Sequence, residues 1–144
     1  MGKYEALTKY IPELKGGNLG TWVIDKESDG TPEHPLQFPF VNYSQLVDHF
    51  QDDLFRFCEE HPEYEHIHYG DTLRENGIDW GSNSMESADA SKLNEKALIA
   101  MLVGACRAER FCDGALLGFF ESGAILRWLN RLKEIDDLTL QSGN

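Results

Sequence analysis

The chain has 144 residues, of which 41% are hydrophobic and 26% are charged, and its formal net charge is −12. This length and composition fit one domain with its own hydrophobic core, and they exclude an intrinsically disordered chain. The apolar runs are shorter than the roughly 20 residues that cross a bilayer, and the N-terminus lacks the apolar stretch of a signal peptide. We therefore expect a single domain over residues 1–144, located in the cytoplasm and without a membrane span.

The N-terminal segment predicts a short amphipathic helix. Tyr4, Leu7, Ile11 and Leu14 recur at helical spacing, and two glycines follow them as a stop signal. Pro12 is expected to kink this helix or to split it in two, because proline cannot donate the backbone hydrogen bond of a helix interior.

Two strands are predicted next, over residues 20–25 and 36–43. Both segments are rich in β-branched and aromatic residues, and a long loop with glycine and proline joins them, as in a hairpin. Pro39 lacks the amide that a central strand requires, so it places its strand at a sheet edge.

The middle of the chain predicts one long helix and then irregular structure. Ser44 can cap a helix over residues 44–60, which carries an apolar stripe. After His61-Pro62, residues 65–69 could form a short third strand. Residues 72–75 read as a capping box for about one helical turn, closed by Asn76-Gly77.

The C-terminal half predicts three helices, over about residues 94–112, 114–122 and 124–135. Asn94 or Ser91 can cap the first helix and Asp113 the second, while Gly123 separates the second from the third. The expected fold class is therefore α+β: a small antiparallel sheet of two or three strands, packed by a central helix and a C-terminal three-helix unit.

One candidate site centres on a carboxylate. At about 100° per residue, Leu98, Leu102 and Ala105 share one face of the predicted helix, and Glu109 falls on that same face. Burying an unpaired carboxylate costs several kcal/mol, so Glu109 should meet a cation, with Arg110 and Arg127 as the nearby candidates. The expected polar cluster consists of Arg107, Glu109, Arg110, Asp113 and Arg127.

This cluster has a structural and a functional interpretation. It could tie two helices together, or it could act as a general acid or base and hold a phosphate or carboxylate ligand. Phe111 is expected to pack in the corner that Asp113-Gly114 creates. Cys112 beside Arg110 has no histidine nearby in sequence, so no catalytic residue is predicted. With an odd count and no C-x-x-C spacing, the cysteines are expected to be reduced and mostly buried: Cys58, Cys106 and Cys112.

The string Glu-Arg-Phe-Cys-Asp-Gly at 109–114, followed by Glu-Ser-Gly at 121–123 and a C-terminal helix, resembles an uncharacterised prokaryotic family of domains of unknown function. The segment 39–44 before the aromatic-rich helix is similar to the entry segment of that family. The resemblance covers about residues 36–135, does not extend to residues 1–35, and implies no known activity.

A second candidate is a histidine cluster. His66 and His68 would lie on one face of a strand, and His61, Glu63 and Asp71 are close in sequence. Such ligands could bind zinc or nickel, but the spacing is not diagnostic, and His-x-His pairs are also common on exposed loops. We therefore predict no metal and no cofactor, with His66 and His68 as weak candidates.

A third candidate is an acidic surface with aromatic residues. Residues 44–91 hold twelve acidic and two basic side chains, whereas residues 92–144 hold seven of each. Such a field repels nucleic-acid phosphates and attracts a basic protein, although a solvated face that only aids solubility would show the same pattern. Trp80 could be an interface anchor or could plug the sheet edge. The expected interaction surface consists of Asp48, Asp52, Asp53, Glu59, Glu60, Tyr64, Tyr69 and Trp80.

Two functional hypotheses follow from these patterns. The first is a non-enzymatic interaction domain that binds a basic partner protein; one version is a phage or mobile-element inhibitor that mimics the charge of nucleic acid. The second is a small-ligand binder or enzyme that uses the Arg–Glu–Arg cluster. Sequence motifs for phosphate loops, nucleophile elbows, zinc peptidases and EF-hands are absent.

Overall fold

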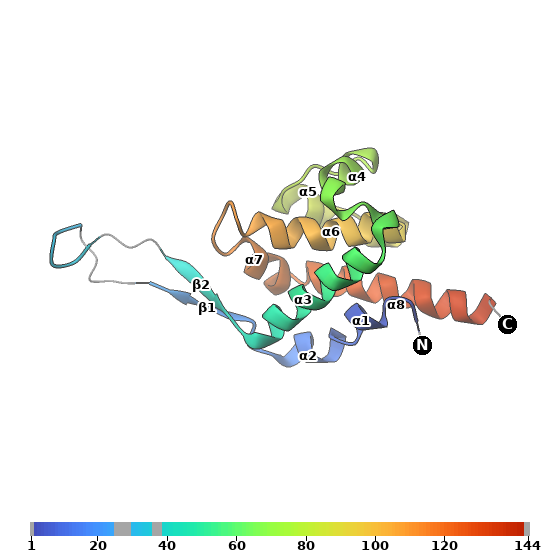
Figure 1. Ribbon diagram of the computed structural model, residues 1–144, viewed down its shortest axis with the longest axis horizontal. Helices are drawn as coiled ribbons and strands as arrows, with labels where there is room; N and C mark the ends of the chain where they lie inside the picture. The colour runs from blue at the N-terminus through green and yellow to red at the C-terminus, as the bar shows by residue number, and fades with distance from the viewer. Residues whose placement is uncertain (1, 25–29, 36–38, 143–144) are drawn as a thin grey trace.

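The computed structural model of the chain describes residues 2–24, 30–35 and 39–142. A helical body carries a β-hairpin that projects from one end of it (Figure 1). The described α-helices are α1 (Glu5–Thr8), α2 (Ile11–Gly16), α3 (Gln45–Glu60), α4 (Tyr69–Glu75), α5 (Ser82–Ser87), α6 (Glu95–Ala108), α7 (Ala115–Glu121) and α8 (Ala124–Ser142). No helix in this described part is long and apolar enough to cross a membrane.

The N-terminal helix is split in two, as Pro12 predicts. Pro12 is the second residue of α2, where its missing N–H is not required by the helix. A buried carboxylate that the sequence pattern did not identify holds the start of the chain: Asp136 of α8 accepts hydrogen bonds from the backbone N–H groups of Lys3 (3.0 Å) and Tyr4 (2.9 Å). The N-terminus is therefore fixed to the C-terminal helix.

The sheet has two antiparallel strands, β1 (Gly20–Val23) and β2 (Phe40–Tyr43). Gly20 is paired with Tyr43 and Trp22 with Val41, so these four residues share one face of the hairpin. The α+β prediction is confirmed, and Pro39 precedes a strand that is an edge. The predicted strand residues 25 and 36–38 lie outside the described residues.

The third strand predicted over residues 65–69 is wrong. The chain forms two 3₁₀ turns there, Pro62–Tyr64 and His66–His68, and then enters α4. Glu65 between them has a φ of 49°, which is incompatible with an extended strand. Thr72 is not a cap either, because it is buried within α4.

The long helices agree with their predicted stripes. Ser44 caps α3, whose buried face consists of Val47, Phe50, Leu54, Phe57 and Cys58. Asn94 caps α6 by accepting a hydrogen bond from the N–H of Ala97 (2.9 Å). Every residue of α6 from Ala97 to Cys106 is buried, so this helix lies at the centre of the hydrophobic core.

The boundaries of the last helices differ from those predicted. α6 ends at Ala108, four residues before the predicted end, because the chain turns through residues 109–114. Gly123, with a φ of 83°, separates α7 from α8 as expected. α8 continues to Ser142, beyond the predicted end at residue 135.

Candidate functional site

The turn between α6 and α7, residues 109–114, is called the corner here, and Glu109 is its central side chain. Oε1 of Glu109 accepts hydrogen bonds from the Tyr43 hydroxyl (2.6 Å) and the Leu116 N–H (3.0 Å). Both carboxylate oxygens accept from the Gly114 N–H, at 3.1 and 3.0 Å. The Tyr43 hydroxyl in turn accepts from the Leu117 N–H (3.0 Å). Glu109 and Tyr43 together therefore satisfy the free amides at the start of α7.

Asp113, the predicted cap of α7, does not fill that role, because Gly114 is the N-cap residue and the caps come from Glu109 and Tyr43. Burial, together with the hydrogen bond to Glu109, raises the pKa of Tyr43. The hydroxyl thus remains protonated and donates to the carboxylate. This arrangement ties β2, α6 and α7 together at one point.

The predicted Arg–Glu–Arg cluster does not form. Among the described residues, no ion pair links Glu109 to an arginine. Arg127 donates to the carbonyl oxygens of Ser122 (3.4 Å) and Glu86 (2.8 Å), while the Arg107 guanidinium lies 4.8 Å from the centre of the Phe55 ring. The physical reason is that α6 ends before Glu109, so its carboxylate meets the positive N-terminal end of α7 instead of a cation.

Gly114 is required at the corner for two reasons. Its φ is 88°, in the left-handed region that side chains disfavour. A Cβ atom built on it would lie 2.2 Å from Cζ2 of Trp22. Since Trp22 and Tyr43 share a face of the hairpin, the hairpin contacts the corner through both residues. The inner side of the corner is therefore a structural joint.

The outer side of the corner is exposed to solvent. Phe111 was expected to pack in the corner, but its side chain is 76% exposed, and its ring meets the edge of Trp80 at 5.4 Å between centroids. Arg110, Cys112 and Asp113 are also exposed. The other two cysteines are buried as expected, and burial raises the pKa of Cys58 to about 11 and of Cys106 to about 12.

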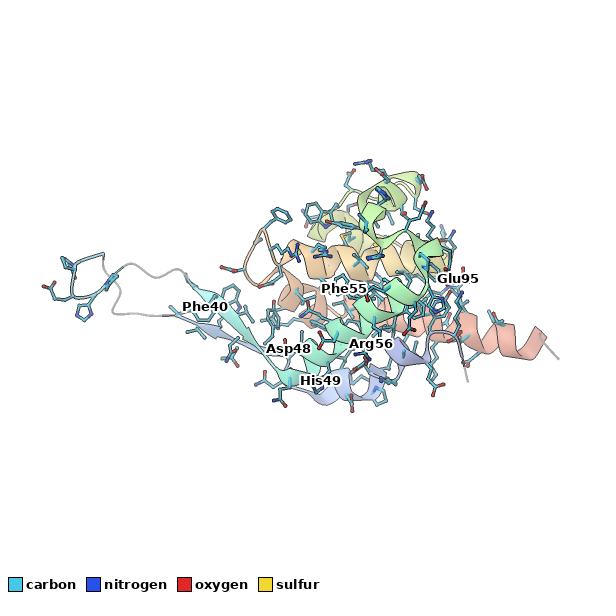
Figure 2. All side chains as sticks on the ribbon, viewed as in Figure 1. Phe40, Asp48, His49, Phe55, Arg56 and Glu95 are labelled. Carbon is cyan, nitrogen blue, oxygen red and sulfur yellow. The ribbon has the colours of Figure 1, made fainter. Side chains whose placement is uncertain are left out.

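An acidic stripe runs along α3. Asp48, Asp52 and Glu59 form this stripe; they are exposed and lie on one side of the helix because their spacings are four and seven residues. Glu60 is also exposed but is turned about 100° away from Glu59. Figure 2 shows Phe55 on the side of α3 toward α6 and Arg56 on the side toward α1 and α2.

Two members of the predicted interaction surface are engaged inside the molecule instead. Asp53 accepts a hydrogen bond from the Tyr10 hydroxyl and lies 3.2 Å from both Lys9 Nζ and Arg56 Nη1. The hydrogen bond from Tyr10, with the two cations, lowers the pKa of Asp53. Tyr64 is only 8% exposed, and its hydroxyl is hydrogen-bonded to that of Tyr4. Asp53 and Tyr64 therefore stabilise the fold and are not part of the exposed interaction surface.

Trp80 lies against α6 and does not plug the sheet edge. Its indole N–H donates to the carbonyl oxygen of Gly104 (3.0 Å), yet the side chain remains 42% exposed. Tyr69 meets it edge-on at 5.9 Å between ring centroids. Tyr69 and Trp80, both members of the predicted interaction surface, are therefore brought together, with Phe111 as a third ring that the sequence pattern did not assign to this surface.

The histidines do not converge on a common point. His66 and His68 lie in a 3₁₀ turn, and Nδ1 of His68 is 4.0 Å from a carboxylate oxygen of Asp71. Nδ1 of His61 lies 3.1 Å from the carboxylate of Glu63. Within residues 2–24, 30–35 and 39–142, no three His, Cys, Asp or Glu side chains are grouped so that they could hold a metal ion.

No curated protein and no solved structure matches this chain. The family described as "Family of unknown function (DUF6508)" matches residues 2–137. This match confirms the expected membership in a family of unknown function, and it extends over the N-terminal residues that the resemblance left out. The chain therefore belongs to the family of unknown function DUF6508.

Proposed function

We propose that this protein is a non-enzymatic interaction domain that binds a basic partner protein through the acidic stripe of α3. The observation that carries this proposal is the state of the stripe's carboxylates. Asp48, Asp52 and Glu59 are exposed, and within the described part of the chain none of them has an ion-pair or hydrogen-bond partner. Their charge is available to another molecule.

The cations near α3 leave most of the negative charge of the stripe uncompensated. Arg56 and Lys9 are engaged by Asp53, on the side of α3 toward α1 and α2. Arg107 lies over the Phe55 ring beside the stripe and keeps its positive charge, which can offset only one of the three negative charges. A field of one sign raises the association rate with a partner of the opposite sign and disfavours partners of the same sign.

One version of the proposal is a phage or mobile-element inhibitor that occupies a nucleic-acid-binding groove. The net charge of −12, the small size and an acidic helix face support this version, because a helix that displays carboxylates can occupy a groove built for phosphates. The protein would act in the cytoplasm. No described contact favours the alternative of an enzyme or small-ligand binder, since the arginines do not converge on Glu109.

Affinity purification from the native host tests the proposal. The wild-type protein is expected to recover at low salt a basic partner that dissociates as salt rises. Reversing the stripe with Asp48→Lys, Asp52→Lys and Glu59→Lys should abolish this recovery. The matched control reverses three other exposed acids, Glu5, Glu13 and Glu121, and changes the net charge equally. Recovery of no partner, or equal loss with both triple variants, would contradict a role for the stripe.

A further inference from the structure

Three aromatic side chains form a continuous row at the surface, which we call the aromatic row: half-buried Tyr69 and exposed Trp80 and Phe111. Trp80 is central and meets both neighbours edge-on, at 5.9 and 5.4 Å between ring centroids. Each edge-on contact covers part of one ring face, yet Trp80 remains 42% exposed and Phe111 76% exposed, so ring surface is left for other groups. The row joins α4 and the segment before α5 to the corner, which is distant from both in sequence.

The central ring is held in place by α6. Besides the hydrogen bond from the Trp80 indole to Gly104, the glycine itself makes room for the ring: a Cβ atom there would lie 3.3 Å from Cδ1 of Trp80 and 3.2 Å from Cε of Met85. A fixed ring loses little conformational entropy when a ligand binds to it. The row is thus a preorganised surface although much of it is exposed.

An open pocket of about 520 Å³ lies beside the row and carries two carboxylates. Tyr69 and Trp80 line it together with Asp71 and Asp79. Asp71 is paired with Arg74, but the carboxylate of Asp79 has no described partner, and the backbone N–H of Asp79 donates to Ser84 Oγ (2.9 Å). The unpaired carboxylate of Asp79 therefore lies in the same pocket as the rings of Tyr69 and Trp80.

The protein's own cations occupy other rings. Lys3 lies over Tyr4 and Tyr64, Lys9 over Tyr10, and Arg107 over Phe55. Over the aromatic row, no lysine or arginine from the described segments is in such a position, even though Arg74 lines the pocket. The row is the place where an external cation can find both a ring face and a free carboxylate.

We propose that the aromatic row and Asp79 bind an arginine side chain of the basic partner, an inference that rests on the proposed function and names the partner's contact. A cation over an aromatic face is attracted by the negative charge of that face. Arginine fits better than lysine because its planar guanidinium stacks on a ring while its N–H fork pairs with a carboxylate.

The row and the acidic stripe border the same end of α6. Trp80 contacts Gly104, and Phe55 beside the stripe contacts Arg107, one helical turn further along α6. One partner can therefore present an arginine to the row and further basic residues to α3. Arg107 and Arg110 also lie at this end of α6, so the basic residues of a partner must avoid these two positive charges.

A titration followed by two-dimensional ¹H–¹⁵N NMR tests the inference with a capped hexa-arginine peptide and its neutral hexa-citrulline counterpart. The arginine peptide should move the indole N–H signal of Trp80 but not that of buried Trp128, and the citrulline peptide should move neither. Phe111→Leu and Asp79→Asn should each weaken arginine-peptide binding by about twofold to fivefold. Both side chains are exposed, so the spectra should otherwise be retained.

The outcomes separate this inference from the proposed function. If the peptide moves only signals of α3, and Phe111→Leu binds it as the wild type does, the aromatic row is not an arginine site. The stripe is then judged by its triple reversal alone. If the peptide moves Trp80 but reversal of the stripe reduces recovery of the native partner no more than the control reversal does, the arginine site holds and the stripe proposal fails. Absence of binding at millimolar peptide and low salt would overturn the arginine site outright.

Discussion

The inner side of the corner and the acidic stripe of α3 use the same functional group in opposite ways. The carboxylate of Glu109 receives hydrogen bonds from one hydroxyl and from two backbone amides, and it completes the start of α7. The carboxylates of Asp48 and Asp52 point to solvent and have no described partner. The surroundings of an acid thus decide its role. A carboxylate whose hydrogen bonds are made within the fold stabilises the fold, whereas an exposed carboxylate without partners is available to another molecule.

The largest expected effect is that of Gly114→Ala. A positive φ costs an alanine about 1 kcal/mol or more, and the contact with Trp22 adds about 1–3 kcal/mol of overpacking, so the free energy of unfolding should fall by roughly 3 kcal/mol. Urea unfolding measures this loss. Gly118→Ala is the matched control, because that glycine lies within α7 with open space around it and should be neutral or slightly stabilising.

A second change separates strain from crowding at the same position. Trp22→Ala removes the ring that the methyl group of Gly114→Ala would contact. The double variant should therefore recover the loss of unfolding free energy that comes from overpacking, but not the loss that comes from the positive φ. If Gly114→Ala proves as stable as the wild type, the corner does not join the hairpin to the helices.

The next effect is that of Glu109→Gln. The amide keeps one acceptor oxygen but directs N–H groups at backbone donors of α7, so we expect a loss of about 1–3 kcal/mol in urea unfolding. Asp113→Asn should change the free energy by less than about 0.5 kcal/mol, because Asp113 is exposed and does not cap the helix. Equal losses in the two variants would show that Asp113 shares the capping role.

The helices could be predicted from the sequence because their signals are local. The apolar stripe of α3 and the caps Ser44 and Asn94 act over three or four residues. The cap of α7 could not be predicted, since Tyr43 lies 66 residues from Glu109 and only the folded hairpin brings them together. Glu109 would lie on the apolar face only if α6 continued through it, whereas the helix ends one residue earlier, at Ala108.

The sequence predicts that residues 44–91 are acidic, but it does not predict which of their carboxylates are exposed. A count of charges cannot distinguish Asp52, which is exposed, from its neighbour Asp53, which Tyr10 and two cations engage. One residue along a helix is a rotation of about 100°, enough to move a carboxylate from solvent to the contact of α3 with Lys9 and Tyr10, which lie between α1 and α2. Phe111 was missed for a related reason, because its neighbour Trp80 is remote in sequence.

Asp53→Asn should have a smaller and pH-dependent effect. The hydrogen bond from Tyr10 and the two cations lower the pKa of Asp53 in the folded state, so its stabilisation is present above the unfolded-state pKa and is lost as pH falls through the folded-state pKa. The variant should be about 0.5–1 kcal/mol less stable than wild type at neutral pH, and the two should converge in acid. A difference that persists unchanged at low pH would exclude this origin.

The smallest expected effect on stability is that of reversing the stripe. Asp48→Lys with Asp52→Lys changes two exposed side chains without described partners, so the free energy of unfolding should change by less than about 1 kcal/mol in total. Asp48 lies in the first turn of α3, where a negative charge favours the helix, so most of any loss should come from that residue. Single variants measured by urea unfolding will show this. A large loss from Asp52→Lys alone would mean that the stripe belongs with Glu109 among the carboxylates that the fold requires, and the contrast between the two regions would disappear.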